Sequence, residues 1–394
     1  MASKQNGAAG TISLPKGGGA LQGLGEKFSP DLQTGTGNFS VPIALPSGRN
    51  GFHPQLTLGY STGAGNGHFG LGWNLSIPGV RRKTSKGIPQ YNAADTFVLS
   101  GAEDLVPISG DVRGVVSYAP RTEGLFARIQ HVRKSGEDYW QVDSRDGLKN
   151  FYGKAPFGSD APTVRNPDDP NQIVSWSLAF TEDTHGNRIE YLYERDGVPT
   201  EGPHHWDQLR LKEVRYVEYD DTSSTPVLSR FLVHVRFRYE VRPDPFSEYR
   251  AGFEIRTTRR CTQIDILTDD RGVEHLSRSY HLVYLDQRSD RSERLPLNGV
   301  SLLSLFHVEG HKLGESPEPM PPLEFGYTTF EPARRHFSRV TGPDLPAVSL
   351  ANPDLELVDL FGDGLPDILQ ISGNVRYWRN LGMGYFLDSG DPNL

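Results

Sequence analysis

The stretch from residue 14 to residue 107 is dense in glycine and proline, yet apolar and polar residues alternate between its turns. In Gln55–Tyr60, for example, Leu56, Leu58 and Tyr60 occupy alternate positions, which places them on one face of a strand. Glycine supplies positive φ angles and proline removes a backbone donor, so neither suits the interior of a long helix. The whole chain holds 43 glycines and 29 prolines among 394 residues. We therefore expect many short strands joined by tight turns.

Composition excludes several classes of protein. The formal net charge of −8 and a pI near 5.9 argue against a nucleic-acid partner, which would require a basic surface. Cys261 is the only cysteine, so the fold cannot depend on an internal disulfide. No apolar run approaches the ~20 residues that cross a bilayer, and residues 1–7 lack the apolar core of a secretory signal. We expect no direct membrane span and, if the protein leaves its cell, a signal-independent route.

Later segments share one plan, in which a strand leads into a turn rich in Asp, Asn and Gly and then into a second strand. They are residues 139–153, residues 176–193 and, for the first strand and the turn, residues 264–273. Their turn residues tolerate the left-handed backbone conformation that tight hairpins require. This internal similarity favours a fold assembled from hairpins.

Between these segments lies a long strand pattern, residues 231–241. The odd-numbered positions from Phe231 to Val241 are apolar, and the even-numbered positions from His234 to Glu240 are polar. The pattern predicts a sheet with one buried and one hydrated face. Two interpretations of the polar face remain open, namely plain solvation and a charged lining that contacts cargo in a lumen. The same two interpretations apply to a nearby arginine cluster, which comprises Arg256, Arg259 and Arg260.

A change of character near residue 330 marks a domain boundary. Residues 316–322 read Ser-Pro-Glu-Pro-Met-Pro-Pro, which is too rich in proline for a central strand or a helix. We predict a flexible Gly-rich tail over residues 1–24, a β domain over residues 25–330 and a separate repeat over residues 331–394.

The N-terminal stretch carries an ordered series of motifs. It runs from Ser13–Ala20 and Thr34–Pro42 through Gly70–Leu75 to Ile77–Arg82 and Phe97–Gly101. This series resembles the N-terminal signature of the SpvB family, which comprises the Salmonella plasmid virulence protein B and the B components of insecticidal toxin complexes. The resemblance covers roughly residues 12–394 and is strongest before residue 107.

Two further resemblances concern the later part of the chain. Residues 176–193 are similar to the tyrosine-aspartate repeats of Rhs shell proteins, whose hairpins stack into a large curved sheet. Residues 357–369 resemble the integrin-type (FG-GAP/VCBS) propeller repeat, and residues 376–386 look like the rest of that blade. Together they imply an all-β fold, a multi-hairpin Rhs-like curved sheet or sandwich followed by an incomplete β-propeller blade. Because a propeller needs several blades, we expect a fragment, a truncated protein or a short form that requires a partner chain.

The blade resemblance also implies a candidate Ca²⁺ site. In such repeats alternate carboxylates converge on a cation that takes six to eight oxygens. Asp359, Asp363 and Asp367 match the first, fifth and ninth ligand positions, and Gly364 permits the sharp turn. Phe361 departs from the pattern at the third position, because it offers no side-chain oxygen. The alternative is a metal-free turn in which these aspartates accept backbone N–H bonds. No other cofactor is predicted.

Evidence for catalysis is weak in the sequence. The ADP-ribosyltransferase activity found in the SpvB family uses a Glu-x-Glu pair, which is missing from this chain, and we expect no serine nucleophile elbow. We interpret Cys261, on a strand pattern, as a small core residue. His307, Glu309 and His311 would share one face of a strand, as a zinc site requires, but a solvated face is the preferred interpretation, as it is for the pair His204 and His205.

These observations lead to one functional hypothesis. By its resemblance, the chain would be a non-enzymatic structural and translocation module of a secreted bacterial toxin complex, forming part of a cargo-encapsulating shell and a docking platform. Its expected partners are a pore-forming component and an Rhs-type cargo component. The protein would be made in the bacterial cytoplasm and secreted by a signal-independent route. The alternative hypothesis is a Ca²⁺-dependent surface adhesion or binding module.

Overall fold

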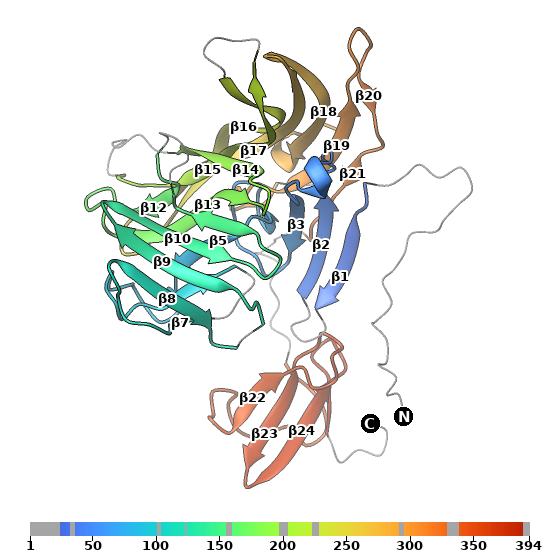
Figure 1. Ribbon diagram of the computed structural model, residues 1–394. Coiled ribbons are helices and arrows are strands. Elements are labelled where there is room, and N and C mark those ends of the chain that lie inside the picture. Colours follow the sequence, from blue (N-terminus) through green and yellow to red (C-terminus); the bar gives the residue numbers. More distant parts are fainter. Residues whose placement is uncertain are drawn as a thin grey trace, which may run out of the picture. The chain divides into compact units, whose positions relative to one another are not determined.

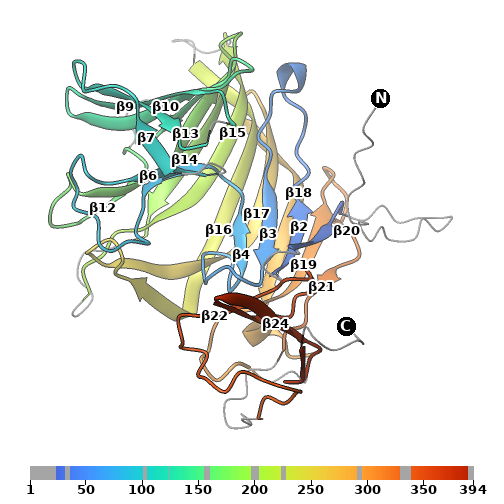
Figure 2. The same ribbon diagram turned by 90° about the horizontal axis from the view of Figure 1, so that it is seen from below.

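The computed structural model describes residues 24–31, 36–100, 104–122, 124–154, 160–196, 204–222, 228–290, 295–328 and 339–388. Within these ranges the secondary structure consists of strands and two single 3₁₀ turns, η1 (Arg49–Gly51) and η2 (Leu285–Gln287), without an α-helix (Figures 1 and 2). The predicted all-β fold is therefore confirmed. Accordingly, the described residues contain no helix of the length and apolar character needed to cross a membrane. Residues 1–23 of the predicted tail and the boundary near residue 330 lie outside the described residues.

Two compact units make up the chain, and each is described by itself. One comprises residues 1–42, 58–65 and 328–394, and the other comprises residues 43–57 and 66–327. In the first unit, β1 (Lys27–Asp31) pairs antiparallel with β2 (Thr36–Pro42), and β3 (Thr57–Ser61) follows β2 in the sheet. The same unit holds an antiparallel four-stranded sheet with the order β22-β23-β24-β25. These strands are Leu355–Val358, Asp367–Ser372, Asn374–Asn380 and Phe386–Asp388.

The N-terminal half of the second unit forms a closed barrel of eight strands. Its ring of pairings runs β5-β6-β7-β8-β9-β10-β11-β13 and returns to β5. The strands are β5 (Gly79–Arg82), β6 (Phe97–Leu99), β7 (Asp104–Pro107), β8 (Val115–Pro120), β9 (Arg128–Lys134), β10 (Glu137–Asp143), β11 (Lys149–Tyr152) and β13 (Ile173–Glu182). Closure depends on β13, which pairs with β5 through Ser175–Ser177 and with β11 through Leu178–Glu182.

Aromatic side chains fill the barrel. The rings of Phe97 and Trp140 lie 4.8 Å apart, and His131 stacks on Trp140 with a centroid distance of 4.3 Å. Trp176 from β13 lies 6.0 Å from Trp140, and the guanidinium of Arg82 lies 4.9 Å from the centre of the Phe97 ring. An eight-stranded barrel is just wide enough for side chains to fill its interior. This barrel is therefore a packed core.

From β13 the chain continues into a broad antiparallel sheet with the order β14-β15-β16-β17-β18-β19 (Figure 2). The strands are β14 (Arg188–Arg195), β15 (Leu209–Asp221), β16 (Leu228–Glu248), β17 (Ile255–Asp270), β18 (Val273–Tyr284) and β19 (Leu303–Gly310). Short strands complete the unit, namely β4 (Trp73–Leu75), β12 (Thr163–Arg165), β20 (Glu318–Pro319) and β21 (Leu323–Glu324). The predicted curved sheet thus contains strands of up to 21 residues.

An N-terminal segment of this unit, residues 43–57, is hydrogen-bonded to side chains of the broad sheet. The Tyr216 hydroxyl donates to the Pro46 carbonyl at 2.6 Å, and Ala44 N donates to the Tyr280 hydroxyl at 2.9 Å. Ile43 and Leu56 are buried, as are the two tyrosines. Apolar side chains of the sheet are therefore covered by chain from the same unit.

Each predicted hairpin is present. The turn between β10 and β11 contains Gly147 at φ +86°, and the turn between β13 and β14 contains Gly186 at φ +80°. β17 and β18 are joined through Arg271 and Gly272, at φ +52° and +90°. These positive φ values explain the glycines, because most side chains disfavour that region.

One residue of the predicted buried face is misplaced. Phe231, Val233, Val235 and Phe237 are buried as expected, but Val241 is 69% exposed. The register of β16 against β17 shifts after Arg238 and again after Val241. An irregularity of this kind reverses the faces of the residues that follow it. Arg242 is buried instead, with 2% of its surface exposed.

Candidate functional site

The polar face of the broad sheet carries a ladder of ion pairs. Glu213, Arg236 and Asp265 are cross-strand neighbours on β15, β16 and β17, and Ser279 and Glu309 continue the row on β18 and β19. Arg236 Nε lies 3.2 Å from a Glu213 oxygen. The pKa of Glu213 is lowered, because hydrogen bonds from His234 and Arg236 outweigh the opposing effect of burial. These charges satisfy one another, and the face has no run of a single sign along this row.

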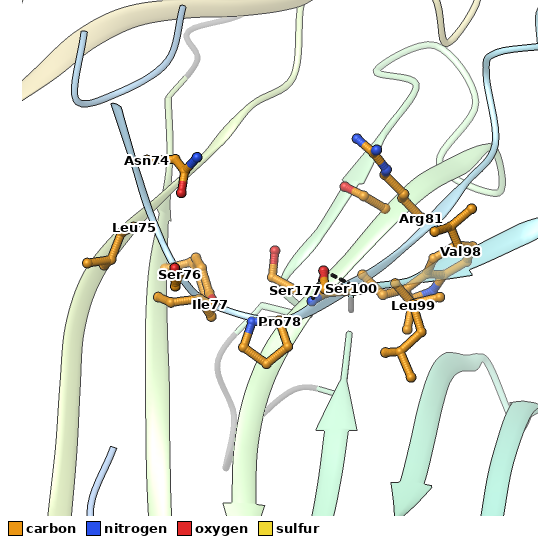
Figure 3. Close-up of a pocket in the computed structure, with 15 residues that line it drawn as sticks. Asn74, Leu75, Ser76, Ile77, Pro78, Arg81, Val98, Leu99, Ser100 and Ser177 are labelled. Carbon is orange, nitrogen blue, oxygen red and sulfur yellow. Dashed lines mark hydrogen bonds between the residues drawn. The ribbon is translucent and has the colours of Figure 1, made fainter. Parts of the chain in front are cut away.

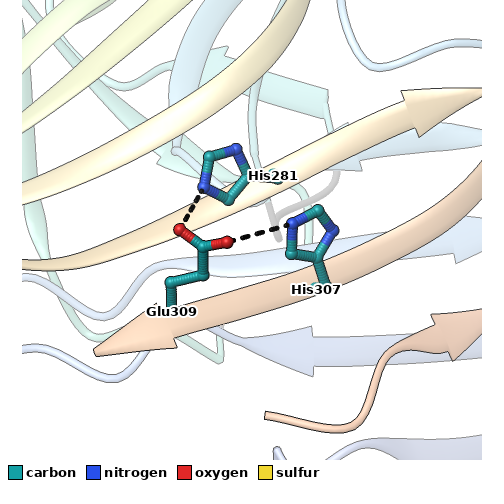
Figure 4. A group of neighbouring side chains, drawn as sticks. All are labelled: His281, His307 and Glu309. Carbon is teal, nitrogen blue, oxygen red and sulfur yellow. Dashed lines mark ion pairs between the residues drawn. The ribbon is translucent and has the colours of Figure 1, made fainter. Parts of the chain in front are cut away.

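A second row lies two residues further along these strands and ends in two histidines. Arg238, Gln263, His281 and His307 are cross-strand neighbours on β16 to β19. His281 and His307 stack with their ring centroids 4.6 Å apart, and Glu309 lies within 4 Å of both (Figure 4). Arg238 Nε donates to Asp265 at 2.6 Å.

Only part of the predicted histidine constellation comes together. His307 and Glu309 share a face of β19, as expected. His311 lies beyond the end of β19, where its Nε2 is 2.7 Å from Ser279 Oγ. His281 takes the place expected for His311. The sequence does not reveal His281, because only the register between β18 and β19 brings it opposite His307.

In the acidic loop of the four-stranded sheet, the aspartates are occupied by backbone groups. Asp359 accepts bonds from the N–H groups of Gly362, Asp363 and Gly364 at 2.8 to 3.2 Å. Asp367, which is fully buried, accepts from Leu360 N and Asn380 N at 2.9 and 2.7 Å.

Hydrogen bonds from backbone N–H groups lower the pKa of Asp359, and the bond from Gly364 N has the largest effect. Burial opposes this shift to a smaller extent. Among the described residues, the carboxylates of Asp359, Asp363 and Asp367 are not gathered into one ligand group. The Ca²⁺ site therefore stays a prediction.

The basic and histidine-rich segments singled out from the sequence are paired. Arg260 is buried and bridges Asp286 at 2.6 Å and Glu240 at 2.8 Å. Arg256 donates to Ser247 Oγ at 2.8 Å, and Arg259 lies 3.9 Å from Asp196. His204 Nδ1 lies 2.8 Å from Glu254, and His205 lies 3.2 Å from Asp168. These groups have local partners and do not form a basic patch together.

Cys261 is a core residue. It lies on β17 with none of its surface exposed, and its backbone N–H donates to the His68 carbonyl at 2.7 Å. Burial raises the pKa of the thiol far above its ordinary value. The interpretation as a small core residue agrees with this environment.

Residues 59–63 read Gly-Tyr-Ser-Thr-Gly and match the spacing of a serine nucleophile elbow, so the expectation that the chain carries no such motif was wrong. In such an elbow the serine lies on a turn between a strand and a helix. Ser61 ends strand β3, and a turn and then loop follow, with no helix before β4. The match is therefore one of spacing only.

A pocket of about 640 Å³ opens beside β5 and β13 (Figure 3). Ser100 Oγ accepts from Gly79 N at 3.0 Å at its edge. Ser76, Ser177 and Arg81 supply further polar groups, and Pro78 lies among them. The described lining offers hydrogen-bonding groups but no carboxylate or histidine.

The family model for the Salmonella virulence plasmid 65kDa B protein matches residues 31–236 and 211–268, which together exceed half of the chain. The mono(ADP-ribosyl)transferase SpvB of Salmonella choleraesuis is 31% identical over an alignment of 306 residues, and the match covers 64% of this chain and 50% of that protein. The protein of the same name from Salmonella typhimurium is 30% identical over 64% of this chain and 49% of its own length. The chain spans about half the length of these curated relatives.

Solved structures with a similar fold include a Tc holotoxin pore and a domain of an effector protein. A crystal structure of TcdB2-TccC3 matches 95% of this chain and 20% of its own, with a TM-score of 0.69 and 28% identity. The Tc holotoxin pore of Photorhabdus luminescens matches 96% of this chain and 20% of its own, with a TM-score of 0.69 and 29% identity. The N-terminal domain of effector protein SpvB from Salmonella typhimurium matches 69% of this chain and 99% of its own, at a TM-score of 0.57 and 25% identity.

The relatives correct one expectation. The sequence predicts a chain that is not an enzyme, partly because it lacks a Glu-x-Glu pair. The curated relatives are named mono(ADP-ribosyl)transferases, so the homology leads to an enzymatic family and contradicts that expectation. The reason for the error is that the Glu-x-Glu motif was sought only in the residues of this chain. The match covers about half of each relative, so the name of the relative describes a longer protein than the part that is aligned.

Proposed function

The chain belongs to the SpvB family, and from this premise we propose that it is a module of a secreted bacterial toxin complex that forms part of a cargo-encapsulating shell and docks on partner subunits. The observation that carries the proposal is the likeness to TcdB2-TccC3. It extends over 95% of this chain at a TM-score of 0.69 and takes up a fifth of the other chain. Because this chain corresponds to only one part of a much longer chain, we expect it to act together with other domains or subunits.

The broad sheet supplies a wall suited to this role. Its apolar residues, such as Val235 and Ile264, are buried. Because such residues are closely packed, they make the sheet stiff. On the ladder of its other face, arginines pair with carboxylates, as Arg236 does with Glu213 and Glu274. A hydrated surface of paired charges offers little apolar area to an unfolded cargo. In this proposal the ladder faces the enclosed space.

The sheet β22–β25 is, in this proposal, the first blade of a propeller that docks on a pore-forming component. Its core consists of Leu355, Ile368, Trp378 and Phe386. Several of its apolar side chains are exposed, including Leu357, Ile371 and Val375 on the strands and Met383 in the turn between β24 and β25. Large exposed apolar groups on one small sheet suggest that further protein covers them, as a neighbouring blade would. The second partner is an Rhs-type cargo component, and secretion follows a signal-independent route.

The proposal is tested by reconstitution. The purified full chain is mixed with a Tc pore-forming component or with an Rhs-type cargo component, and each mixture is examined by size-exclusion chromatography with light scattering. We expect a stable complex with the Rhs-type component and slower digestion of that component by a protease. Separate elution from both components and unchanged digestion would contradict the proposal.

A further inference from the structure

The cluster of His281, His307 and Glu309 arises from two simple relations within a sheet. His307 and Glu309 are two residues apart on β19, so their side chains leave the same face. His281 is the register partner of His307 on β18, and directly opposed residues on one face bring their Cβ atoms to within about 5.5 Å. Rigid strands therefore hold three metal-binding side chains together without any loop.

The distances in the cluster suit a small cation. Nε2 of His281 lies 3.4 Å from one oxygen of Glu309, and Nε2 of His307 lies 3.8 Å from the other. One ligand atom from each residue lies within 4.8 Å of those from the other two. Ligands bound at about 2.0–2.2 Å in a tetrahedral site are about 3.3 Å apart, so a modest closure around an ion is enough. Figure 4 shows one nitrogen of each imidazole directed at the carboxylate.

The setting of the His307 ring also suits a metal ligand. His307 Nδ1 is a buried nitrogen with no hydrogen-bond partner among the described residues, so the ring is held by packing and stacking.

Neighbouring groups complete the surroundings without taking part as ligands. Ser279 Oγ lies 3.0 Å from His281 Nε2 and 2.7 Å from His311 Nε2. The Ser279 hydroxyl therefore lies between His311 and His281. The side chains of the three candidate ligands are 25 to 29% exposed, so an ion can reach them from solvent.

We propose that His281, His307 and Glu309 form a Zn²⁺ site with three protein ligands and one coordination position open to water. Two imidazoles and a carboxylate are a ligand set that zinc accepts, whereas Ca²⁺ prefers six to eight oxygens. The site is built on the sheet and is independent of the acidic loop around Asp359. Its ligand set is the kind found in catalytic rather than closed structural zinc sites, because one position remains free.

The test is a titration of the full chain with ZnCl₂ after treatment with a chelator, followed by calorimetry near neutral pH. We expect one saturable site per chain that CaCl₂ does not occupy. H281A, H307A and E309Q should each weaken zinc binding by at least about tenfold, since even residues that only support a metal ligand commonly change affinity by 10–100-fold. E309Q keeps the shape of the side chain and guards against a folding defect, which circular dichroism monitors.

Two control variants separate this site from adventitious binding to surface histidines. H311A removes the nearby histidine that is not a ligand, and H185A removes a histidine whose side chain is 70% exposed. Both should bind zinc as the unaltered chain does, and Co²⁺ should give the visible absorption of a tetrahedral site in both. A lack of saturable binding, or zinc binding that survives H281A, H307A and E309Q, overturns the proposal. Equal losses in H185A and H307A would also overturn it.

Discussion

Arg242 and Asp244 form an ion pair in which the nitrogen Nη2 lies 2.9 Å from the carboxylate and the arginine side chain is fully buried. The same arginine donates to the Gly67 carbonyl at 3.0 Å, and Asp244 accepts from Ser301 N at 2.7 Å. The pair therefore joins β16 to two loops that are distant in sequence. Burial alone would raise the pKa of Asp244, but the hydrogen bonds from Arg242 and Ser301 lower it.

Breaking this pair should destabilise the second unit strongly. D244N leaves the buried Arg242 guanidinium without its counter-charge, and such a loss costs about 3–5 kcal/mol. R250A is the control, since its pair with Glu248 is exposed and exposed pairs contribute about 0–1 kcal/mol. Urea unfolding of both variants measures the difference. Similar losses of unfolding free energy in the two variants would contradict the prediction.

Stability should fall when the pH drops from 7 toward 5. Burial lowers the pKa of His131, against an opposing hydrogen bond to Asp138. Its pKa in the folded state is thus below the unfolded value of about 6.5, so the unfolded chain binds more protons in this range. The contribution is complete above about pH 6.5 and is lost as the pH falls toward the folded pKa. Carboxylates with lowered pKa values, such as Asp244, extend the loss below about pH 4.

Melting temperatures measured at a series of pH values check this expectation. H131N should flatten the slope between pH 7 and 5, although it also lowers the melting temperature overall. H185A is the matched control variant, because this histidine is exposed on a hairpin turn. An unchanged slope in H131N would show that other groups titrate.

Two glycines with similar backbone angles should respond differently to alanine. Gly153, at φ +75°, would place a Cβ 2.3 Å from Cδ1 of the buried Trp176, whereas Gly186, at φ +80°, has open space around that position. The positive φ alone costs roughly 1–2 kcal/mol. We expect G186A to lose about that much and G153A clearly more, because the indole in the barrel cannot move aside. Thermal melting compares them, and equal losses would argue against a rigid barrel core.

The acidic loop should depend on Asp359 whether or not Ca²⁺ is present. D359A removes the acceptor for three backbone N–H groups and should loosen the sheet β22–β25 in both EDTA and CaCl₂. Hydrogen exchange of residues 355–388 measures this. A stabilisation by CaCl₂ that D363N abolishes would instead support the predicted Ca²⁺ site and the adhesion hypothesis.

Cys261 should be unreactive in the folded protein. Its thiol is fully buried and its pKa is raised by burial, so the thiolate that reacts with alkylating agents is scarce. Iodoacetamide should modify the folded chain very slowly and the guanidinium-unfolded chain quickly, as mass spectrometry can follow. Rapid labelling under native conditions would mean that β17 opens locally.

Local sequence patterns were sufficient for the strands and their turns. Alternation in residues 231–237 fixed which side chains are buried, because the period of a strand is two. Glycines such as Gly147 and Gly186 marked turns, because only they adopt positive φ without a penalty. The same reasoning failed at Val241. There a change of register exchanges the buried and exposed faces of β16, and no local sequence pattern reveals that change.

The tertiary structure decided what depends on partners distant in the chain. Closure of the barrel by β13, burial of Arg242 against loops around residues 67 and 301, and the meeting of His281 with His307 all require pairings between separated segments. A periodic pattern states which face a side chain takes but not which residue stands opposite. Strand register sets that second choice through many weak contacts acting together, so the ladder and the histidine cluster became visible only in three dimensions.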